Sequence, residues 1–204
     1  MKKYLILVNG KSPKKKRILP FIEEGYKLVC ADGGANSAYK LELLPDFIVG
    51  DFDSIKPRVK KFYKDFSTFV KIKDQDRTDT EKALEFVIKN GAKEVLVFGV
   101  NGNRSDHVYY NIQIFSKFAK KVDLAVIEDK EVINFITQSI EFETEKNERI
   151  SLFCMNDSLH VKSNGLKYEL NGKNIASISN KTVKKKVILE LKNSGSLMVV
   201  RELK

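Results

Sequence analysis

The sequence is poor in cysteine, with only Cys30 and Cys154 among its 204 residues. Both lie in apolar stretches far apart, so we expect the buried free thiols of a cytoplasmic protein rather than a disulfide or a metal site. The chain has no run of about 18 apolar residues, so no transmembrane helix is expected. The first apolar run ends at Asn9-Gly10-Lys11, which makes it too short for a secretory signal and predicts a buried strand instead.

Several catalytic motifs are also missing. The sequence has no Gly-x-x-x-x-Gly-Lys-Ser/Thr stretch, which excludes a P-loop nucleotide site. It has no Gly-x-Ser-x-Gly motif and no cysteine–histidine arrangement, so nothing indicates acyl transfer. Any chemistry is therefore expected from the charged residues, which make up 31% of the chain.

Basic residues outnumber acidic ones, giving a formal net charge of +10. The densest clusters are Lys11 with residues 14–17, and residues 184–186. Neither cluster has interleaved aromatic residues and no nucleic-acid-binding motif is present, so nucleic acid is not an expected partner. A solvated lysine-rich surface is the simpler interpretation, and attraction of a polyanionic small molecule such as a nucleotide is the alternative.

The first two thirds of the chain alternate between strand-like and helix-like segments. A helix is expected from Thr80 to Asn90, opened by a capping box of Thr78 and Glu81, and another from Asp106 to about Phe118. This alternation predicts an α/β domain over residues 1–130, with a mostly parallel sheet and helices on both faces. Strands are expected at residues 4–8, 27–31, 46–50, 68–72, 94–99 and 122–127.

The pattern changes at about Glu131, after which no helical periodicity follows. Strand-like segments are separated by turn residues such as Asn171-Gly172 and Ser194-Gly195. We expect a smaller all-β domain over residues 131–204, either a sandwich or a short barrel. Its strands are expected at residues 131–136, 139–144, 149–155, 158–163, 166–170, 185–191 and 196–203.

Acidic and glycine-containing loops follow four of the expected strands. Because the carboxyl ends of parallel strands meet at one edge of a sheet, these loops should converge there. Each loop alone is explained by ordinary turn and capping residues. Together they fit magnesium and phosphate better. Their polar residues are Asp32 and Asn36, then Asp51 and Asp53, then Asp74, Asp76 and Asp79, and finally Arg104, Asp106 and His107.

Asp51 and Asp53 are the most informative pair. Residues two apart on an extended chain point the same way, so both carboxylates would face one spot, where a divalent cation would offset their repulsion. Lys82 and Arg104 could then neutralise phosphate oxygens. His107 could contact a nucleotide or simply sit at a helix start. The residues alone thus indicate an acidic, metal-dependent, phosphate-directed site.

These loops, in this order, resemble the thiamine pyrophosphokinase family. The resemblance covers nearly the whole chain, and the combination of "GDFDS" with "DQDRTDTEK" is specific. The matching stretches are "ADGGAN" (31–36), "LLPDFIVGDFDSI" (43–55), "DQDRTDTEKAL" (74–84), "GVNGNRSDHVYYNI" (99–112), "GLKYEL" (165–170) and "SISN" (177–180).

The resemblance implies an enzyme that transfers the diphosphate of ATP to the hydroxyl of thiamine, giving thiamine diphosphate and AMP. It implies a homodimer with active sites at the subunit interface, and Mg²⁺ held by the catalytic acids Asp51, Asp53 and Asp79. Thiamine would meet Ser177, Ser179 and Asn180. The implied ATP-binding residues are Asp32, Gly33, Gly34, Asn36, Gln75, Arg77, Thr78, Lys82, Gly102, Arg104, Asp106 and His107.

One departure concerns the aromatic residues, since the sequence has no tryptophan. Some family members stack thiamine against a tryptophan shortly after the Ser-Asn pair, where this chain has Lys181-Thr182-Val183. Val183 would forgo the aromatic contribution of about 0.5–1.5 kcal/mol, so weaker thiamine binding or tolerance of other hydroxyalkyl heterocycles is expected.

Two other functions stay open at this point. One is a Mg²⁺-dependent diphosphokinase or nucleotidyltransferase that acts on another alcohol, which keeps the acidic loops but not the "SISN" contact. The other is a non-catalytic nucleotide- or nucleic-acid-binding module centred on the lysine clusters, which leaves the acids without a purpose.

Overall fold

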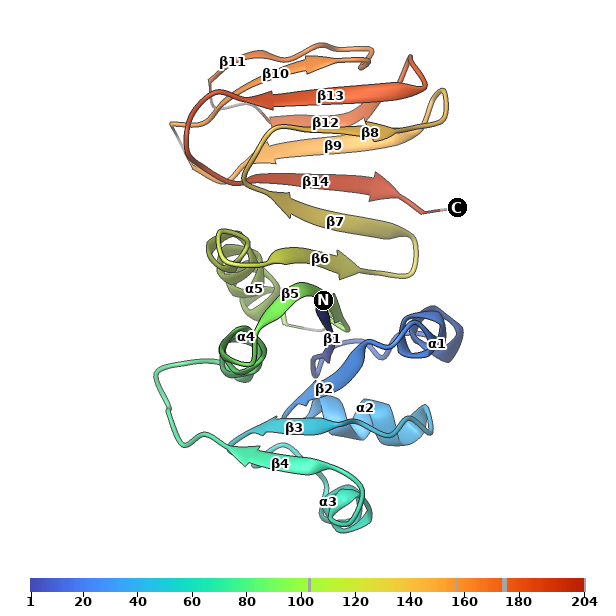
Figure 1. The fold of residues 1–204 in the computed structure, drawn as a ribbon, viewed down its shortest axis with the longest axis vertical. Helices are drawn as coiled ribbons and strands as arrows, with labels where there is room; N and C mark the ends of the chain where they lie inside the picture. The colour runs from blue at the N-terminus through green and yellow to red at the C-terminus, as the bar shows by residue number, and fades with distance from the viewer. Residues whose placement is uncertain (103, 157, 174–175, 204) are drawn as a thin grey trace. The chain divides into compact units, whose positions relative to one another are not determined.

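Residue contacts divide the chain into two units in the computed structural model, which describes residues 1–102, 104–156, 158–173 and 176–203 (Figure 1). Unit 1 comprises Met1–Ile114 and Val126–Asp129, and unit 2 comprises Phe115–Ala125 and Lys130–Lys204. Strand β6 (Asp123–Ile127) contains residues of both. The expected domain boundary at residue 130 stays a prediction.

Unit 1 contains a parallel sheet with the strand order β5-β1-β2-β3-β4. Its strands are almost continuously apolar because both faces are covered, and Leu5, Ile6 and Leu7 are completely buried. The chain moves outward from β1 to β4 and then returns to the other side of β1, which creates a topological switch point between β1 and β5. The strands are β1 (Lys2–Leu7), β2 (Lys27–Ala31), β3 (Phe47–Gly50), β4 (Thr68–Lys71) and β5 (Ala92–Phe98).

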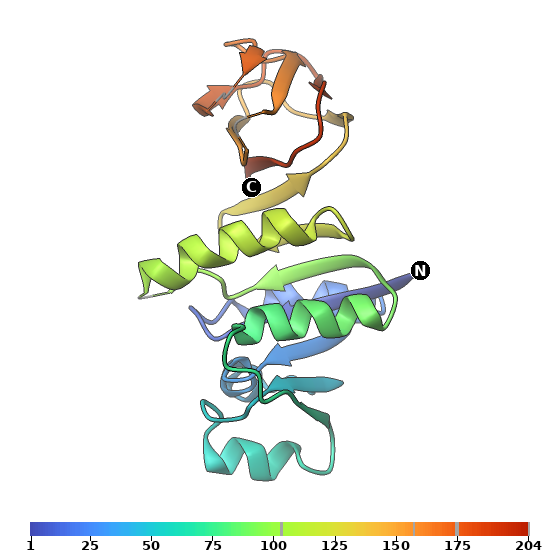
Figure 2. The ribbon, with the colours of Figure 1, turned by 90° about the vertical axis from the view of Figure 1, so that its left-hand side faces the viewer.

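Helices cover both faces of this sheet, which confirms the expected α/β class. Figures 1 and 2 show α4 on one face and α1 and α2 on the other. The predicted capping box of Thr78 and Glu81 is present at the start of α4, with both of its hydrogen bonds formed. The helices are α1 (Lys15–Glu23), α2 (Gly34–Lys40), α3 (Pro57–Tyr63), α4 (Asp79–Lys89) and α5 (Ser105–Phe118).

In unit 2 the strand pairs formed by β7 to β14 are antiparallel, and its described residues from 131 onward include no helix. One layer has the order β12-β9-β14-β7 and the other the order β11-β10-β13-β8. The expected all-β architecture is therefore confirmed. The strands are β7 (Glu131–Ile136), β8 (Ile140–Glu143), β9 (Arg149–Cys154), β10 (His160–Asn164), β11 (Asn171–Lys173), β12 (Ala176–Lys181), β13 (Lys186–Leu191) and β14 (Leu197–Glu202).

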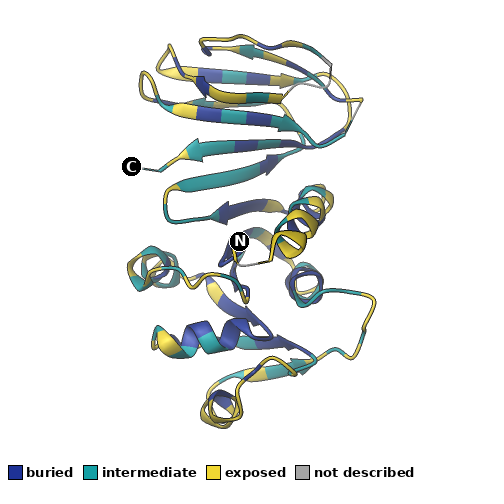
Figure 3. Ribbon diagram, turned by 180° about the vertical axis from the view of Figure 1, so that it is seen from behind, coloured by how far each residue is buried: buried dark blue, intermediate teal, exposed yellow. Residues whose placement is uncertain are grey.

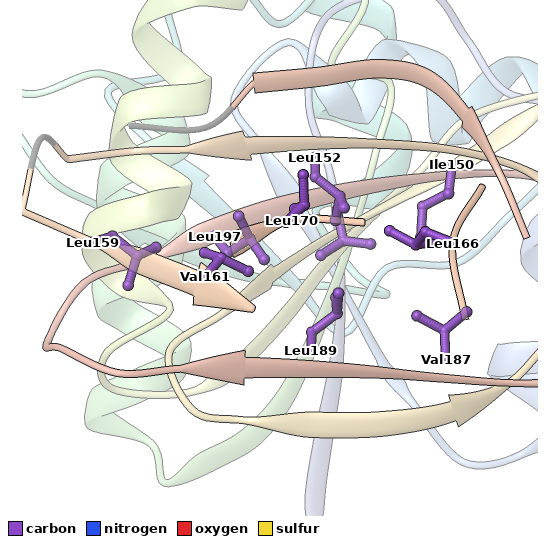
Figure 4. Packing of buried hydrophobic residues seen from close by; sticks show 10 residues of the cluster. Ile150, Leu152, Leu159, Val161, Leu166, Leu170, Val187, Leu189 and Leu197 are labelled. Atoms are coloured by element: carbon purple, nitrogen blue, oxygen red, sulfur yellow. The ribbon is translucent and has the colours of Figure 1, made fainter. Parts of the chain in front are cut away.

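The core of unit 2 is aliphatic. Residues from both layers point toward each other, including Leu152 of one layer and Leu189 of the other (Figure 4). Along β13 buried residues alternate with more exposed ones, as a strand with one covered face requires. Figure 3 shows this alternation along several strands of unit 2, whereas burial in unit 1 is concentrated in the strands and on the inner sides of the helices.

Residues 166–170 were expected to form a strand, and this expectation is wrong. The backbone N–H and C=O of Tyr168 bond to the side chain of Asn180, at 3.1 Å and 2.7 Å, instead of to a neighbouring strand. The pair Asn171-Gly172 was expected to be a turn but belongs to β11, where Gly172 pairs with Val161 of β10. The buried amide of Asn180 has thus taken the two backbone hydrogen bonds of Tyr168 that a strand partner would have made.

The two cysteines differ in their surroundings and form no disulfide. Cys30 lies in β2 and is completely buried, which raises the pKa of its thiol above the ordinary value. Cys154, in β9, is only half-buried, so the expectation of two buried thiols holds for Cys30 alone.

None of the helices in the described ranges has the length and apolar character needed to cross a bilayer.

Candidate active site

A cavity of about 1200 Å³ opens in unit 1 at the carboxyl ends of the parallel strands. Loops that follow β1 to β5 line it, which is where ligands bind in open α/β sheets. The residues predicted for the site are mostly brought together there. Those lining the cavity are Asp32, Gly33, Asp51, Gln75, Arg77, Thr78, Asp79, Lys82, Gly102, Arg104, Asp106 and His107.

Asp32 directly follows β2 and is only 1% exposed. Its Oδ2 accepts a hydrogen bond of 3.0 Å from the backbone N–H of Ser54. Its Oδ1 is buried and has no hydrogen-bond partner in the described part of the chain. Burial raises the pKa of Asp32 to about 6, assisted by the negative charges of Asp79 and Asp53 and opposed by the hydrogen bonds from Ser54. Asp32 is therefore a buried carboxyl group with an unused oxygen.

Asp51 and Asp53 come together by a route that the sequence did not predict. The chain is not extended here, because β3 ends at Gly50 and Phe52 has a left-handed backbone with φ +73°. The turn is closed by the backbone N–H of Asp53, which donates to Asp51 Oδ1 at 3.3 Å. The Phe52 ring packs edge-on against Phe69 of β4, with 5.2 Å between the ring centroids.

Carboxylate oxygens converge at this turn. One oxygen each from Asp32, Asp51 and Asp53 lies within 4.8 Å of the others. Gly50 permits this approach, since a Cβ at Gly50 would lie 2.8 Å from the Cβ of Asp32. Such a set of oxygen donors suits a hard divalent cation.

Asp79 and Lys82 lie on the first turn of α4, three residues apart and on the same side. The Lys82 side chain is 2% exposed, and its ammonium lies 3.0 Å from Asp79 Oδ1 and 3.1 Å from Asp51 Oδ2. The positive charge between Asp51 and Asp79 thus comes from the chain itself.

This lysine affects the pKa values of its partners differently. Burial acts to raise the pKa of Asp51, but the hydrogen bonds from Lys82 and from the Asp53 backbone N–H, together with the charge of Lys82, outweigh burial and lower the pKa. For Asp79, burial raises the pKa despite the same lysine. Burial acts to lower the pKa of Lys82, but its two carboxylate partners raise it overall. Lys82 and Asp51 therefore stay charged over a wide pH range.

The two arginines of the cavity are held differently. Arg77 donates from Nε to Asp74 Oδ2 at 2.7 Å and also pairs with Glu85 of α4. Its charge is therefore already shared between two acidic side chains. Arg104 bonds to Asp106 at 3.2 Å, and its side chain remains 68% exposed. Arg104 is consequently the more available cation for an incoming anion.

Three further predicted residues lie outside the cavity lining and act on its structure. Asp53 belongs to the acidic turn. Asn36 donates from Nδ2 to Ser54 O at 2.9 Å and accepts from the Lys56 N–H at 3.0 Å, which fixes residues 54–56. Gly34 begins α2, where a Cβ would lie 2.0 Å from the backbone oxygen of Leu7. These contacts hold the loops of the site in place without lining the cavity.

Other cavity residues were not predicted. The loop after β1 contributes Asn9, Gly10 and Lys11, and α5 contributes Tyr110 and Asn111. Asn9 and Gly10 could have been predicted from the sequence, because this polar pair follows a buried parallel strand in the same way as the other loops of the site do. Tyr110 could not, because its hydroxyl reaches the site by donating to Glu81 at 3.2 Å across two helices.

The remaining predicted residues lie in unit 2, on β12. Asn180 is 1% exposed, and its amide bonds to Tyr168, Lys181 and Ser177. Ser179 has φ +56° and lies in a bulge of the β12–β9 pairing, where its N–H donates to Ser151 Oγ. Ser177 is half-buried and Ser179 is exposed. The hydroxyl groups of Ser177 and Ser179 can thus still donate a hydrogen bond to a ligand, whereas the amide of Asn180 is already used within unit 2.

The unused oxygen of Asp32 leads to a prediction about stability. Its pKa in the folded protein, about 6, lies above the ordinary value of 3.8, so the folded state binds this proton more tightly than the unfolded state. The free energy of unfolding should therefore fall as the pH rises from about 4 to about 6. We expect Asp32→Asn, without metal, to raise this free energy by about 1–3 kcal/mol at pH 7 and to change it little near pH 4.

Urea unfolding in EDTA at both pH values measures this difference. Asp65→Asn, which alters an exposed acid of the same unit, serves as the matched control and should have no effect at either pH. An equal effect of Asp32→Asn at the two pH values would show that the charge of Asp32 is not the cause.

Comparison with known proteins identifies the family. The model for "Thiamin pyrophosphokinase, catalytic domain" matches residues 21–127, just over half of the chain. Thiamine pyrophosphokinase 1 of Oryza sativa subsp. japonica is 32% identical over 139 residues, 56% of this chain and 52% of that protein. This chain thus spans about half the length of that relative.

Two bacterial comparisons extend over more of the chain. The thiamine pyrophosphokinase of Bacillus subtilis (strain 168) is 25% identical over 178 residues, 84% of this chain and 83% of that protein. The crystal structure of thiamine pyrophosphokinase from Bacillus subtilis matches with a TM-score of 0.82 at 23% identity, covering all of both chains, which shows a shared fold. With the catalytic-domain match, these findings place the chain in the thiamine pyrophosphokinase family.

Proposed function

We propose that this chain transfers the terminal diphosphate of ATP to the hydroxyl group of thiamine, giving thiamine diphosphate and AMP. The observation that carries the proposal is the convergence of Asp32, Asp51 and Asp79 with Lys82 in one cavity at the sheet's carboxyl edge. Family membership supports it, since the matched region holds most of this cavity.

The proposal includes Mg²⁺ held by Asp51, Asp53 and Asp79, with Asp32 beside them. Two features fit such an ion: the buried Oδ1 of Asp32 has no hydrogen-bond partner among the described residues, and the available donors are carboxylate oxygens. When bound, Mg²⁺ would offset the negative charge of the transferred phosphates.

The chain's own residues would bind and orient the triphosphate. Arg104, exposed at the cavity wall, can present two N–H groups to phosphate oxygens, and Lys11 adds a positive charge from the loop after β1. Gln75 and His107 line the same cavity. Thr78 contributes indirectly, because its hydroxyl caps α4 and thereby fixes Asp79.

The reaction that we propose is a displacement at the β-phosphorus. The hydroxyl oxygen of thiamine forms a bond to that phosphorus as the bond to the bridging oxygen of AMP breaks, and the hydroxyl proton is released. Such transfers depend on positioning and charge neutralisation more than on a strong base. The fixed turn at Asp51–Asp53 and the capped start of α4 supply the positioning.

For thiamine itself, we assign Ser177 and Ser179 as the contacts, in a homodimer where they belong to the subunit opposite the catalytic cavity. Ser177 Oγ accepts from Asn180 at 2.9 Å and keeps its own O–H to donate. Asn180 is assigned a supporting role, because its amide is already used within unit 2.

The test incubates the purified protein with ATP, Mg²⁺ and thiamine and follows AMP and thiamine diphosphate. We expect equal amounts of the two products, loss of both in excess EDTA, and recovery when Mg²⁺ is restored in excess. Loss is expected because the acids alone repel the triphosphate.

Other product patterns contradict the proposal. ADP in place of AMP would mean transfer of a single phosphoryl group. AMP without thiamine diphosphate would mean that another alcohol or water is the acceptor. Binding of ATP without turnover at any Mg²⁺ concentration would favour a non-catalytic nucleotide-binding module.

A further inference from the structure

Lys82 lies between two acidic residues of the cavity, Asp51 and Asp79. Lysine is almost never fully buried unless it is paired, and the side chain of Lys82 is 2% exposed. The sequence suggested that Lys82 contacts phosphate. In the structure its ammonium instead contacts two carboxylates, Asp51 Oδ2 at 3.1 Å and Asp79 Oδ1 at 3.0 Å.

These contacts occupy oxygens that a cation would also use. Asp51 Oδ2 accepts from Lys82, and Asp51 Oδ1 accepts from the backbone N–H of Asp53. Both oxygens of Asp51 therefore already carry a hydrogen bond. Asp79 likewise shares one oxygen with the ammonium. A divalent cation that draws on Asp51 has to weaken one of these bonds and to approach a fixed positive charge.

We propose that Lys82 is the internal counter-cation of this cluster: it holds Asp51 and Asp79 together in the metal-free protein and competes with the divalent cation for them. Lys82 thus stabilises the fold and at the same time weakens cation binding, which keeps the cation exchangeable. The inference rests on the cation site of the proposed function but not on the identity of the acceptor.

The test uses Lys82→Met, which keeps the length of the side chain and removes its charge. Lys89→Met is the matched control, since Lys89 is an exposed lysine in the last turn of the same helix. Mn²⁺ serves as the probe without nucleotide, because it prefers the same oxygen ligands and its free fraction can be counted by electron paramagnetic resonance.

Two changes are expected in Lys82→Met and neither in Lys89→Met. In EDTA the Tm should fall by about 5–10 °C, since two half-buried carboxylates lose their shared partner. The Kd for Mn²⁺ should fall roughly tenfold, because the positive charge that competes for Asp51 and Asp79 is gone. Lys82→Arg, which keeps the charge, should bind Mn²⁺ like the unaltered protein.

Other results overturn the inference. An unchanged or weaker Mn²⁺ affinity in Lys82→Met would mean that the lysine does not compete, while AMP formation from ATP and thiamine would still stand as a separate result. If Lys82→Met does not fold, Lys82→Gln, a neutral hydrogen-bond donor, should show the same tightening, and its absence counts equally against the inference. No Mn²⁺ binding by any form would overturn both this inference and the proposed cation site.

Discussion

Asp51→Asn is expected to lower kcat for thiamine diphosphate formation by about 10²–10³-fold, which corresponds to about 2.7–4 kcal/mol. Asp51 takes part in two sets of contacts. One of its oxygens lies near those of Asp32 and Asp53, and Asp51 also pairs with Lys82. An amide there keeps the shape but loses the charge, so cation binding and the placement of the ammonium both suffer. Steady-state AMP and thiamine diphosphate formation measures the effect.

A control within the adjacent loop separates this effect from a general change of charge. Asp76 is exposed and is not among the residues that line the cavity, so Asp76→Asn should retain turnover within about twofold. Saturating Mg²⁺ should not restore Asp51→Asn fully, because Lys82 also loses a partner. Near-normal turnover of Asp51→Asn would contradict the assignment of this acid.

Gly34→Ala is expected to be the most destabilising single-methyl change among the glycines that line or support the site, with a loss of about 3 kcal/mol or more in the free energy of unfolding. A Cβ at Gly34 would lie 2.0 Å from the backbone oxygen of Leu7, so α2 has to move away from β1. Neither side can yield easily, because Leu7 is completely buried within the sheet. Chemical denaturation in EDTA measures the loss.

Gly102→Ala is the comparison for this change. Its Cβ would meet Gly10 at 3.4 Å, an ordinary contact, and its backbone is not in the left-handed region. Its stability should stay within about 0.5 kcal/mol of the unaltered protein. If Gly34→Ala proved equally mild, α2 would not be held against β1 as closely as the structure places it.

The parts of the fold that sequence reasoning predicted are those with a local cause. The parallel strands are apolar runs that end at polar residues, and α4 has a capping box together with an apolar face. The helices α1, α2 and α3 lack a side-chain cap, although α1 has an apolar face and α3 begins with Pro57. Their N-cap positions are Lys14, Gly33 and Lys56. Short helices of this kind depend on packing, which a sequence pattern does not report.

The candidate site likewise has features that could be predicted from the sequence and features that could not. Strand ends in a parallel sheet place acids on one edge, so the positions of Asp32, Asp51 and Asp79 could be anticipated from the order of the loops. Their detailed geometry could not. The left-handed turn at Phe52 depends on a ring packed against Phe69, and the burial of Lys82 depends on where α4 lies. Both are consequences of tertiary contacts, not of residue spacing.

The burial of Cys30 makes its thiol a native reporter of local unfolding in unit 1. Cys30 is completely buried in the sheet of unit 1, and burial raises the pKa of its thiol, so an alkylating reagent meets almost no thiolate while β2 stays paired. Cys154 is half-buried in β9 of unit 2. The rate at which the Cys30 thiol is modified therefore reports how often the sheet of unit 1 opens, and Cys154 provides the comparison of a thiol that is already partly exposed.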